Sequence, residues 1–160
     1  MKITKVWAVY FSPTGNTKKV ITTMAKKAAE VLSVPMETFD FTLPENREGI
    51  TSFESEDLVF FSTPVYAGRI PNKMLPYVQS AFEGNGAFAV PVSVFGNRNF
   101  DNGLIELRNE LELHGSIRSQ LLESRQSMCS AISLRQDVRM RMISRRSRNL
   151  VRRSRRKLLI

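Results

Sequence analysis

A loop of hydroxyl and amide residues between a strand and a helix constrains this chain more than any other feature. Residues 5–11 form an apolar, β-prone run, which predicts a buried strand. Residues 18–32 are mostly good helix formers, with apolar residues at Val20, Met24, Ala28 and Val31. Between them lies Ser12-Pro13-Thr14-Gly15-Asn16-Thr17. The first N–H groups of a helix lack partners within it, and its dipole favours an anion. The sequence therefore predicts a phosphate site, unless the loop only caps the helix.

The donors of this loop are neutral. Ser12, Thr14 and Thr17 offer hydroxyl groups, Asn16 offers an amide, and Gly15 lets the backbone approach a ligand closely. The loop contains no lysine, whereas a magnesium triphosphate site would show Gly-x-x-x-x-Gly-Lys. A phosphate monoester suits these donors better than a triphosphate does.

Strands and helices are predicted to alternate along the first 114 residues. We expect strands at 3–10, 35–41, 57–63 and 87–95, and helices at 16–33, 71–82 and 101–114. The polar connection 42–56 allows one short helical turn, and Pro91 predicts a bulge or irregular pairing in the fourth strand. This alternation predicts a doubly wound α/β fold with a parallel sheet.

Two further loops follow predicted strands, and they carry a family resemblance. They are Thr63-Pro64-Val65-Tyr66-Ala67-Gly68-Arg69-Ile70-Pro71 and Phe95-Gly96-Asn97-Arg98-Asn99-Phe100-Asp101. Ligands of open parallel sheets bind outside the carboxyl ends of the strands, where all three loops fall. Together the loops resemble those of the flavodoxin-like family, most like the flavodoxin domains of ferredoxin-linked bacterial flavoproteins. The resemblance covers residues 1–114.

The resemblance implies strand order 2-1-3-4-5 and a bound FMN. Its phosphate would lie on Ser12, Thr14, Gly15, Asn16 and Thr17. The ring would be enclosed by Thr63, Pro64, Val65, Tyr66, Ala67 and Gly68 from one loop, and by Gly96, Asn97, Arg98, Phe100 and Asp101 from the other. Tyr66 would stack on one face of the ring, and Phe100 would cover the other face or the rim.

Several of these residues have a structural alternative. Tyr66 could instead rest on the core, and Phe100 could be a hydrophobic staple for the next helix. Asp101 could be only an N-cap, and Arg69 and Arg98 could be solvated surface charges.

The leading functional expectation is an FMN-binding electron carrier that exchanges electrons with a ferredoxin or an oxidoreductase. An alternative is an NAD(P)H-dependent FMN or quinone reductase on the same fold, although no second nucleotide motif is visible. The chain has one cysteine, Cys129, and one histidine, His114. We expect neither of them to be catalytic, and we expect no metal site. Without an apolar run long enough to cross a bilayer or a signal sequence, the expected location is cytoplasmic.

Composition changes abruptly at Gly115. Residues 1–114 carry 11 Lys and Arg against 13 Asp and Glu, whereas residues 115–160 carry 13 against 2. Every Phe, Tyr, Trp and Pro precedes residue 115, and Arg and Ser make up 21 of the last 46 residues. We therefore expect an incomplete flavodoxin-like domain at 1–114 and a distinct basic segment at 115–160. The fifth strand and the last helix are doubtful, since residues 117–122 form a poor strand.

Three interpretations of the basic segment remain open. It could be a binding arm for nucleic acid or an anionic surface, although no aromatic residue is interleaved to stack on bases. It could be a solvated tail without a function of its own. It could also arise from a shift of reading frame near Gly115. One base earlier, the codons of residues 136–140 can encode Ala-Gly-Arg-Pro-Asp, which resembles the ferredoxin-linked family. Without its native edge strand, the domain would tend to aggregate.

Overall fold

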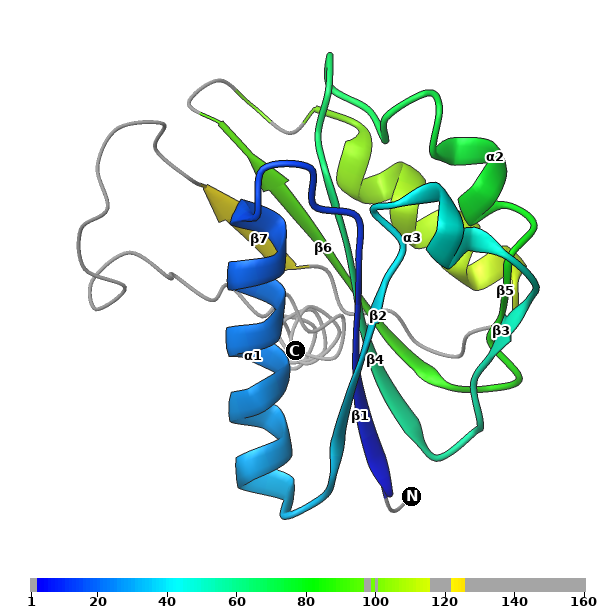
Figure 1. The fold of residues 1–160 in the computed structure, drawn as a ribbon. Coiled ribbons are helices and arrows are strands. Elements are labelled where there is room, and N and C mark those ends of the chain that lie inside the picture. The colour runs from blue at the N-terminus through cyan, green and yellow to red at the C-terminus, as the bar shows by residue number, and fades with distance from the viewer. Residues whose placement is uncertain (1–2, 97–98, 100, 116–121, 126–160) are drawn as a thin grey trace, which may run out of the picture.

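Five parallel strands of the described chain form the central sheet, in the order β2-β1-β4-β6-β7 (Figure 1). The computed structural model describes residues 3–96, 99, 101–115 and 122–125. The strands are β1 (Lys5–Tyr10), β2 (Met36–Asp40), β4 (Asp57–Pro64), β6 (Phe88–Phe95) and β7 (Leu122–Arg125). Each neighbouring pair is parallel. This is the order of flavodoxin-type sheets, so the predicted fold class is confirmed.

Helices cover both faces of the sheet, as Figure 1 shows. Side chains of β1 alternate between the two faces, because successive residues of a strand point in opposite directions. Val6, Ala8 and Tyr10 pack in one buried cluster with α1 (Asn16–Leu32). Val9 belongs to the other cluster, which also includes residues of α2 (Leu75–Val78) and α3 (Gly103–Leu113). The central strands are therefore buried on both sides, as their apolar sequences predict.

The buried face of α1 differs in part from the predicted one. Val20, Ile21, Ala25 and Ala29 are its buried apolar residues, whereas Val31 is 81% exposed. Val31 lies in the last turn of the helix, before Ser33 takes a left-handed conformation.

The helix predicted at 71–82 is mostly a turn and a short helix. Pro76 has no N–H to donate, which interrupts the regular helical ladder and leaves only α2. Residues beyond it form β5 (Phe82–Glu83), which pairs with β3 (Thr51–Ser52) in a small second sheet. The predicted short turn in the 42–56 connection is η1 (Pro44–Arg47). The small sheet was not predicted, because two-residue strands leave no periodic pattern.

The bulge expected at Pro91 is absent. The register between β4 and β6 is continuous, and Pro91 lies opposite Phe61. The carbonyl of Val94 accepts a hydrogen bond from Val65 on the β4 side. Successive residues of a strand direct their backbone N–H and C=O groups alternately to the two neighbouring strands. Val94 directs its carbonyl toward β4, so Pro91, three residues earlier, directs its backbone away from β4. The pairing with β7 begins one residue later, at Val92. Among the described residues, no ladder bond needs the N–H group that Pro91 lacks.

A fifth strand is present despite the expectation that it was doubtful. β7 pairs with β6 from Val92↔Leu122 to Phe95↔Arg125. The last helix of the expected fold would fall within residues 126–160, which lie outside the described residues, as does most of the basic segment.

Candidate functional site

The β1–α1 loop is anchored at Ser12. The Ser12 hydroxyl oxygen accepts a hydrogen bond from the Lys18 N–H at 2.9 Å, and the Ser12 N–H donates to the Thr42 hydroxyl oxygen at 2.9 Å. The Lys19 N–H donates to the Gly15 carbonyl at 3.0 Å. Ser12 is only 8% exposed. Ser12 therefore fixes the loop to Thr42 and accepts one of the N–H groups of the first turn of α1.

The rest of the loop presents free donors. Thr14, Gly15 and Asn16 are exposed, whereas Thr17 is buried. Within the described part of the chain, the N–H groups of Asn16 and Thr17 have no hydrogen-bond partner. Gly15 has φ 79°, a left-handed conformation that glycine adopts without strain. The first turn of α1 holds no acidic residue, so nothing in it opposes an anion at these donors.

The loop after β4 is a tight turn that exposes Tyr66. Tyr66 and Arg69 exchange both backbone hydrogen bonds, at 3.0 and 3.1 Å. Ala67 and Gly68 between them both have positive φ, as a type I′ hairpin turn requires. Tyr66 is 50% exposed, so about half of its surface is open to a ligand or to solvent. Thr63 is buried inside β4, and the Val65 N–H donates to Val94, which leaves Pro64, Tyr66 and Ala67 nearer the surface.

The third loop lies partly outside the described residues. Gly96 is exposed after β6, while Asn97, Arg98 and Phe100 are not among the described residues. Asp101 is exposed and has φ 42°. The N-cap of α3 is Asn102, so the alternative that Asp101 caps this helix is wrong.

Contacts join the second loop to the start of α3. The Asn102 N–H donates to the Gly68 carbonyl at 3.0 Å. A Cβ atom on Gly68 would lie 2.6 Å from Asp101 Oδ2, so a side chain at this position would force the Asp101 side chain to shift. Gly68 and Asp101, predicted from two separate loops, are therefore in contact.

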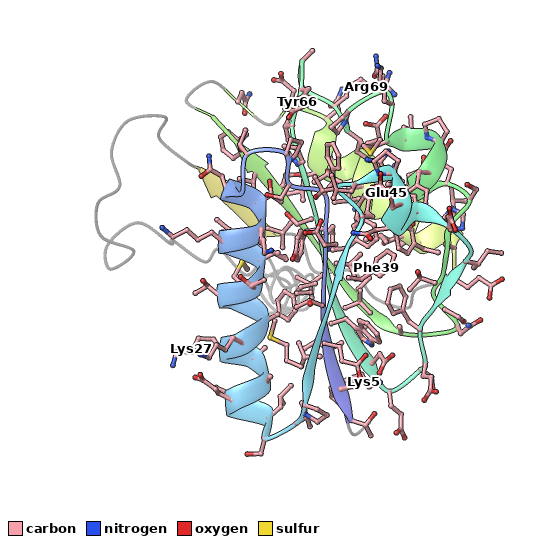
Figure 2. All side chains as sticks on the ribbon, in the orientation of Figure 1. Lys5, Lys27, Phe39, Glu45, Tyr66 and Arg69 are labelled. Atoms are coloured by element: carbon pink, nitrogen blue, oxygen red, sulfur yellow. The ribbon has the colours of Figure 1, made fainter. Side chains whose placement is uncertain are left out.

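Glu106 of α3 fixes the turn from behind, a role that the sequence did not indicate. Its Oε2 accepts the Ile70 N–H at 2.9 Å, and its Oε1 accepts the Arg69 side-chain Nε at 3.0 Å. This pairing raises the pKa of Arg69. Arg69 is thus an ion-paired surface residue, and Figure 2 shows it beside Tyr66, at the opposite end of the molecule from Lys5.

A cavity of about 650 Å³ opens beside Tyr66 and Ala67. Phe11 and Pro13 line it from the end of β1, and Arg47 and Met74 line it from η1 and the approach to α2. The sequence did not indicate this cavity, because its lining comes from three stretches of chain that lie far apart in sequence, within residues 11–13, 42–47 and 66–74.

No metal site is visible in the structure described. No group of three or more His, Cys, Asp or Glu residues in that part of the chain could hold a metal ion. No helix there is both long and apolar enough to cross a membrane.

Comparison with known proteins adds one structural likeness. No family model matches the chain, and no curated protein matches it. A similar solved structure is named "Putative flavoprotein from Bacteroides uniformis ATCC 8492". The match has a TM-score of 0.50 and 16% sequence identity, and it covers 78% of this chain and 94% of that one. At this identity the likeness concerns the fold, a parallel α/β sheet of flavodoxin type.

Proposed function

We propose that this protein binds FMN and serves as an electron-transfer flavoprotein. The observation that carries the proposal is the position of two features at one edge of the sheet. The N–H groups of Asn16 and Thr17, which have no partner among the described residues, follow β1. The exposed Tyr66 follows the neighbouring strand β4. Neutral donors at a helix N-terminus suit a phosphate, and an exposed aromatic ring suits a flat heterocycle. The name of the similar solved structure agrees with a flavin.

Each part of the site has a distinct task in this proposal. The N–H groups of Asn16 and Thr17, with the Thr14 hydroxyl, would hold the phosphate. Tyr66 would orient the ring and shield one face from water. Bound flavin supplies the ability to take up and release electrons, while the protein supplies binding and orientation. The exposed edge beside Tyr66 would then face a redox partner, a ferredoxin or another oxidoreductase.

The first experiment titrates the apoprotein with FMN, riboflavin and FAD and follows quenching of flavin fluorescence. Riboflavin is FMN without its phosphate, so their difference in affinity isolates the phosphate loop. We expect FMN to bind more tightly than riboflavin by at least about tenfold, since a hydrogen bond to a charged group contributes roughly 1.5–3 kcal/mol. Equal affinities would contradict the phosphate site, and tighter binding of FAD would contradict the choice of FMN.

Two variants assign the two halves of the site. Thr14→Val keeps the shape of the side chain and removes its hydroxyl, so it should weaken FMN binding and leave riboflavin unchanged. Tyr66→Ala should weaken both ligands, and the matched Tyr66→Phe should weaken neither. A folded Tyr66→Ala protein with unchanged affinity would remove Tyr66 from the site.

Electron transfer itself is tested with the flavin-loaded protein. Photochemically reduced protein should pass its electrons to an oxidised ferredoxin in a stopped-flow mixing experiment. Steady oxidation of NADPH by the purified protein, without any protein partner, would favour a reductase instead.

A further inference from the structure

The cavity beside Tyr66 is distinct from the phosphate loop. Thr14, Gly15, Asn16 and Thr17 do not line it, and of that loop only Pro13 does. Phe11 and Met74 in its lining belong to the buried cluster on the α2 and α3 face, whereas α1 packs on the opposite face. With the proposed ring site the cavity shares only Tyr66 and Ala67.

The lining combines apolar walls with positive charge. Phe11, Pro71 and Met74 contribute apolar surface, and Tyr66 contributes an aromatic ring. Arg47, Arg69 and Lys73 contribute three cations, while no carboxylate is among the described lining residues. A cavity of this size and composition is typical of sites for small organic ligands.

Arg47 is positioned but not neutralised. Its Nε donates to the Phe41 carbonyl at 2.8 Å, and its Nη2 donates to the Thr42 carbonyl. Its guanidinium carbon lies 5.8 Å from the centre of the Phe11 ring. Both hydrogen-bond partners are neutral carbonyls, so the positive charge remains available to a ligand. A guanidinium held in this way loses little conformational freedom on binding an anion.

The three cations differ in availability. Arg69 is paired with Glu106, whereas neither Arg47 nor Lys73 forms an ion pair with any described residue. Lys73 is exposed at the rim, and Arg47 is half-buried. Two unpaired positive charges beside an apolar cavity favour a ligand with negative charge at one end and an apolar body.

We propose that this cavity binds a small aromatic anion, with its ring system against Phe11 and Met74 and its acidic group at Arg47 and Lys73. Binding requires no flavin. Because Tyr66 and Ala67 are shared by both sites, such a ligand would lie beside the flavin and suit the role of a small redox substrate. That role, unlike the binding itself, rests on the proposed function.

Two dyes of nearly the same shape test the proposal with the apoprotein. 8-Anilinonaphthalene-1-sulfonate carries a negative charge, and N-phenyl-1-naphthylamine is its uncharged counterpart. We expect saturable enhancement of the sulfonate's fluorescence with one site per chain, and at least about tenfold weaker binding of the neutral dye. Raising the salt concentration should weaken only the charged dye.

Lys73→Met and Arg47→Met should each weaken the sulfonate by about tenfold and leave the neutral dye unchanged. Lys27→Met is the matched control, because Lys27 lies on α1, far from Tyr66 in Figure 2, and should alter neither dye. Arg47 also holds two carbonyls, so near-ultraviolet circular dichroism must show that its variant is folded. Lys73 donates to no described partner, and its variant tests the proposal independently of folding.

Two results would overturn the proposal. The first is equal binding of the two dyes, insensitive to Lys73→Met. The second is competition between the sulfonate and FMN, measured as a loss of FMN affinity at saturating dye, which would make the cavity part of the flavin site. A protein that binds the sulfonate as expected but no flavin would contradict the proposed function alone.

Discussion

At the scale of single residues, Tyr10 has a strongly shifted pKa among the described groups. Its side chain is 2% exposed at the end of β1, and the Asp40 carboxylate lies nearby. Burial first, and then the negative charge of Asp40, raise the pKa of Tyr10 to about 12. Both effects disfavour the ionised phenol.

This pKa predicts a loss of stability in alkali. The unfolded chain releases the tyrosine proton near pH 10, whereas the folded chain holds it until about pH 12. The free energy of unfolding should therefore fall between pH 10 and 12, by roughly 1–3 kcal/mol from this group, and Tyr10→Phe should abolish that part. Urea denaturation across this range measures it. Tyr66→Phe, at an exposed site, should behave like the unchanged protein. If Tyr10→Phe shows the same alkaline loss, the burial of Tyr10 is wrong.

Gly68 and Gly15 form a second comparison at this scale. Both have φ 79°, but a Cβ atom at Gly15 meets nothing within 4 Å, whereas one at Gly68 meets Asp101 Oδ2 at 2.6 Å. Gly15→Ala should cost about 1–2 kcal/mol of unfolding free energy from backbone strain alone. Gly68→Ala should cost more, and adding Asp101→Gly should restore the excess. Equal losses for the two alanine variants would contradict the contact between Gly68 and Asp101.

At the scale of elements, α3 holds the turn after β4 through the Asn102 N–H, which donates to the Gly68 carbonyl, and through the Glu106 carboxylate. Glu106 accepts both the Ile70 N–H and the Arg69 side chain, so the turn that carries Tyr66 is tied to a helix packed on the sheet. Without this carboxylate the turn would keep only its own two backbone hydrogen bonds and the one from Asn102, so it would open more often.

Glu106→Ala should release this turn. We expect amide hydrogen exchange at residues 66–70 to accelerate by about tenfold, and flavin affinity to fall although Glu106 is not a proposed ligand contact. Glu110→Ala is the control, because Glu110 lies on α3 like Glu106 but accepts its hydrogen bond from the Gln79 side chain at the end of α2, not from the turn. Unchanged exchange in Glu106→Ala would show that the turn does not depend on this carboxylate.

The sequence predicted the elements that carry a periodic pattern and missed those that depend on distant partners. Buried apolar runs located β1, β4 and β6 to within two residues, since parallel strands covered on both faces need such runs. The Glu106 contact and the Arg47 cavity were not predicted, because each joins residues from separate segments. Pro91 misled the prediction, since only the pairing shows on which side its missing N–H falls.

At the scale of the whole molecule, β7 is the edge strand that pairs with β6 in the described sheet. Val92 and Val94 of β6 are buried in the α1 cluster, and the β6 backbone pairs with β7 over four residues. An unpaired strand of this apolar character is a template for association with other chains.

Two truncations should therefore behave differently. A chain ending after Arg125 retains β7, whereas a chain ending after Gly115 exposes the backbone of β6. We expect the shorter chain to aggregate at concentrations where the longer one stays monomeric, and light scattering with size-exclusion chromatography measures this. Equal solubility and equal melting temperatures for the two truncations would show that β7 contributes nothing to the domain.

The topology of the sheet also sets the order in which the molecule can assemble. Every pair in the main sheet is parallel, so neighbouring strands are joined by long crossovers. In the register of β1 and β4, for example, Lys5 lies opposite Asp57. Proteins dominated by such distant pairings fold slowly, because chain closure precedes the contacts that reward it. During synthesis, β1 emerges first but gains its second neighbour only when β4 has been made. The proposed phosphate loop at Ser12–Thr17 therefore rests on paired neighbouring strands only after about the first 64 residues have been synthesised, so its geometry is fixed late in folding.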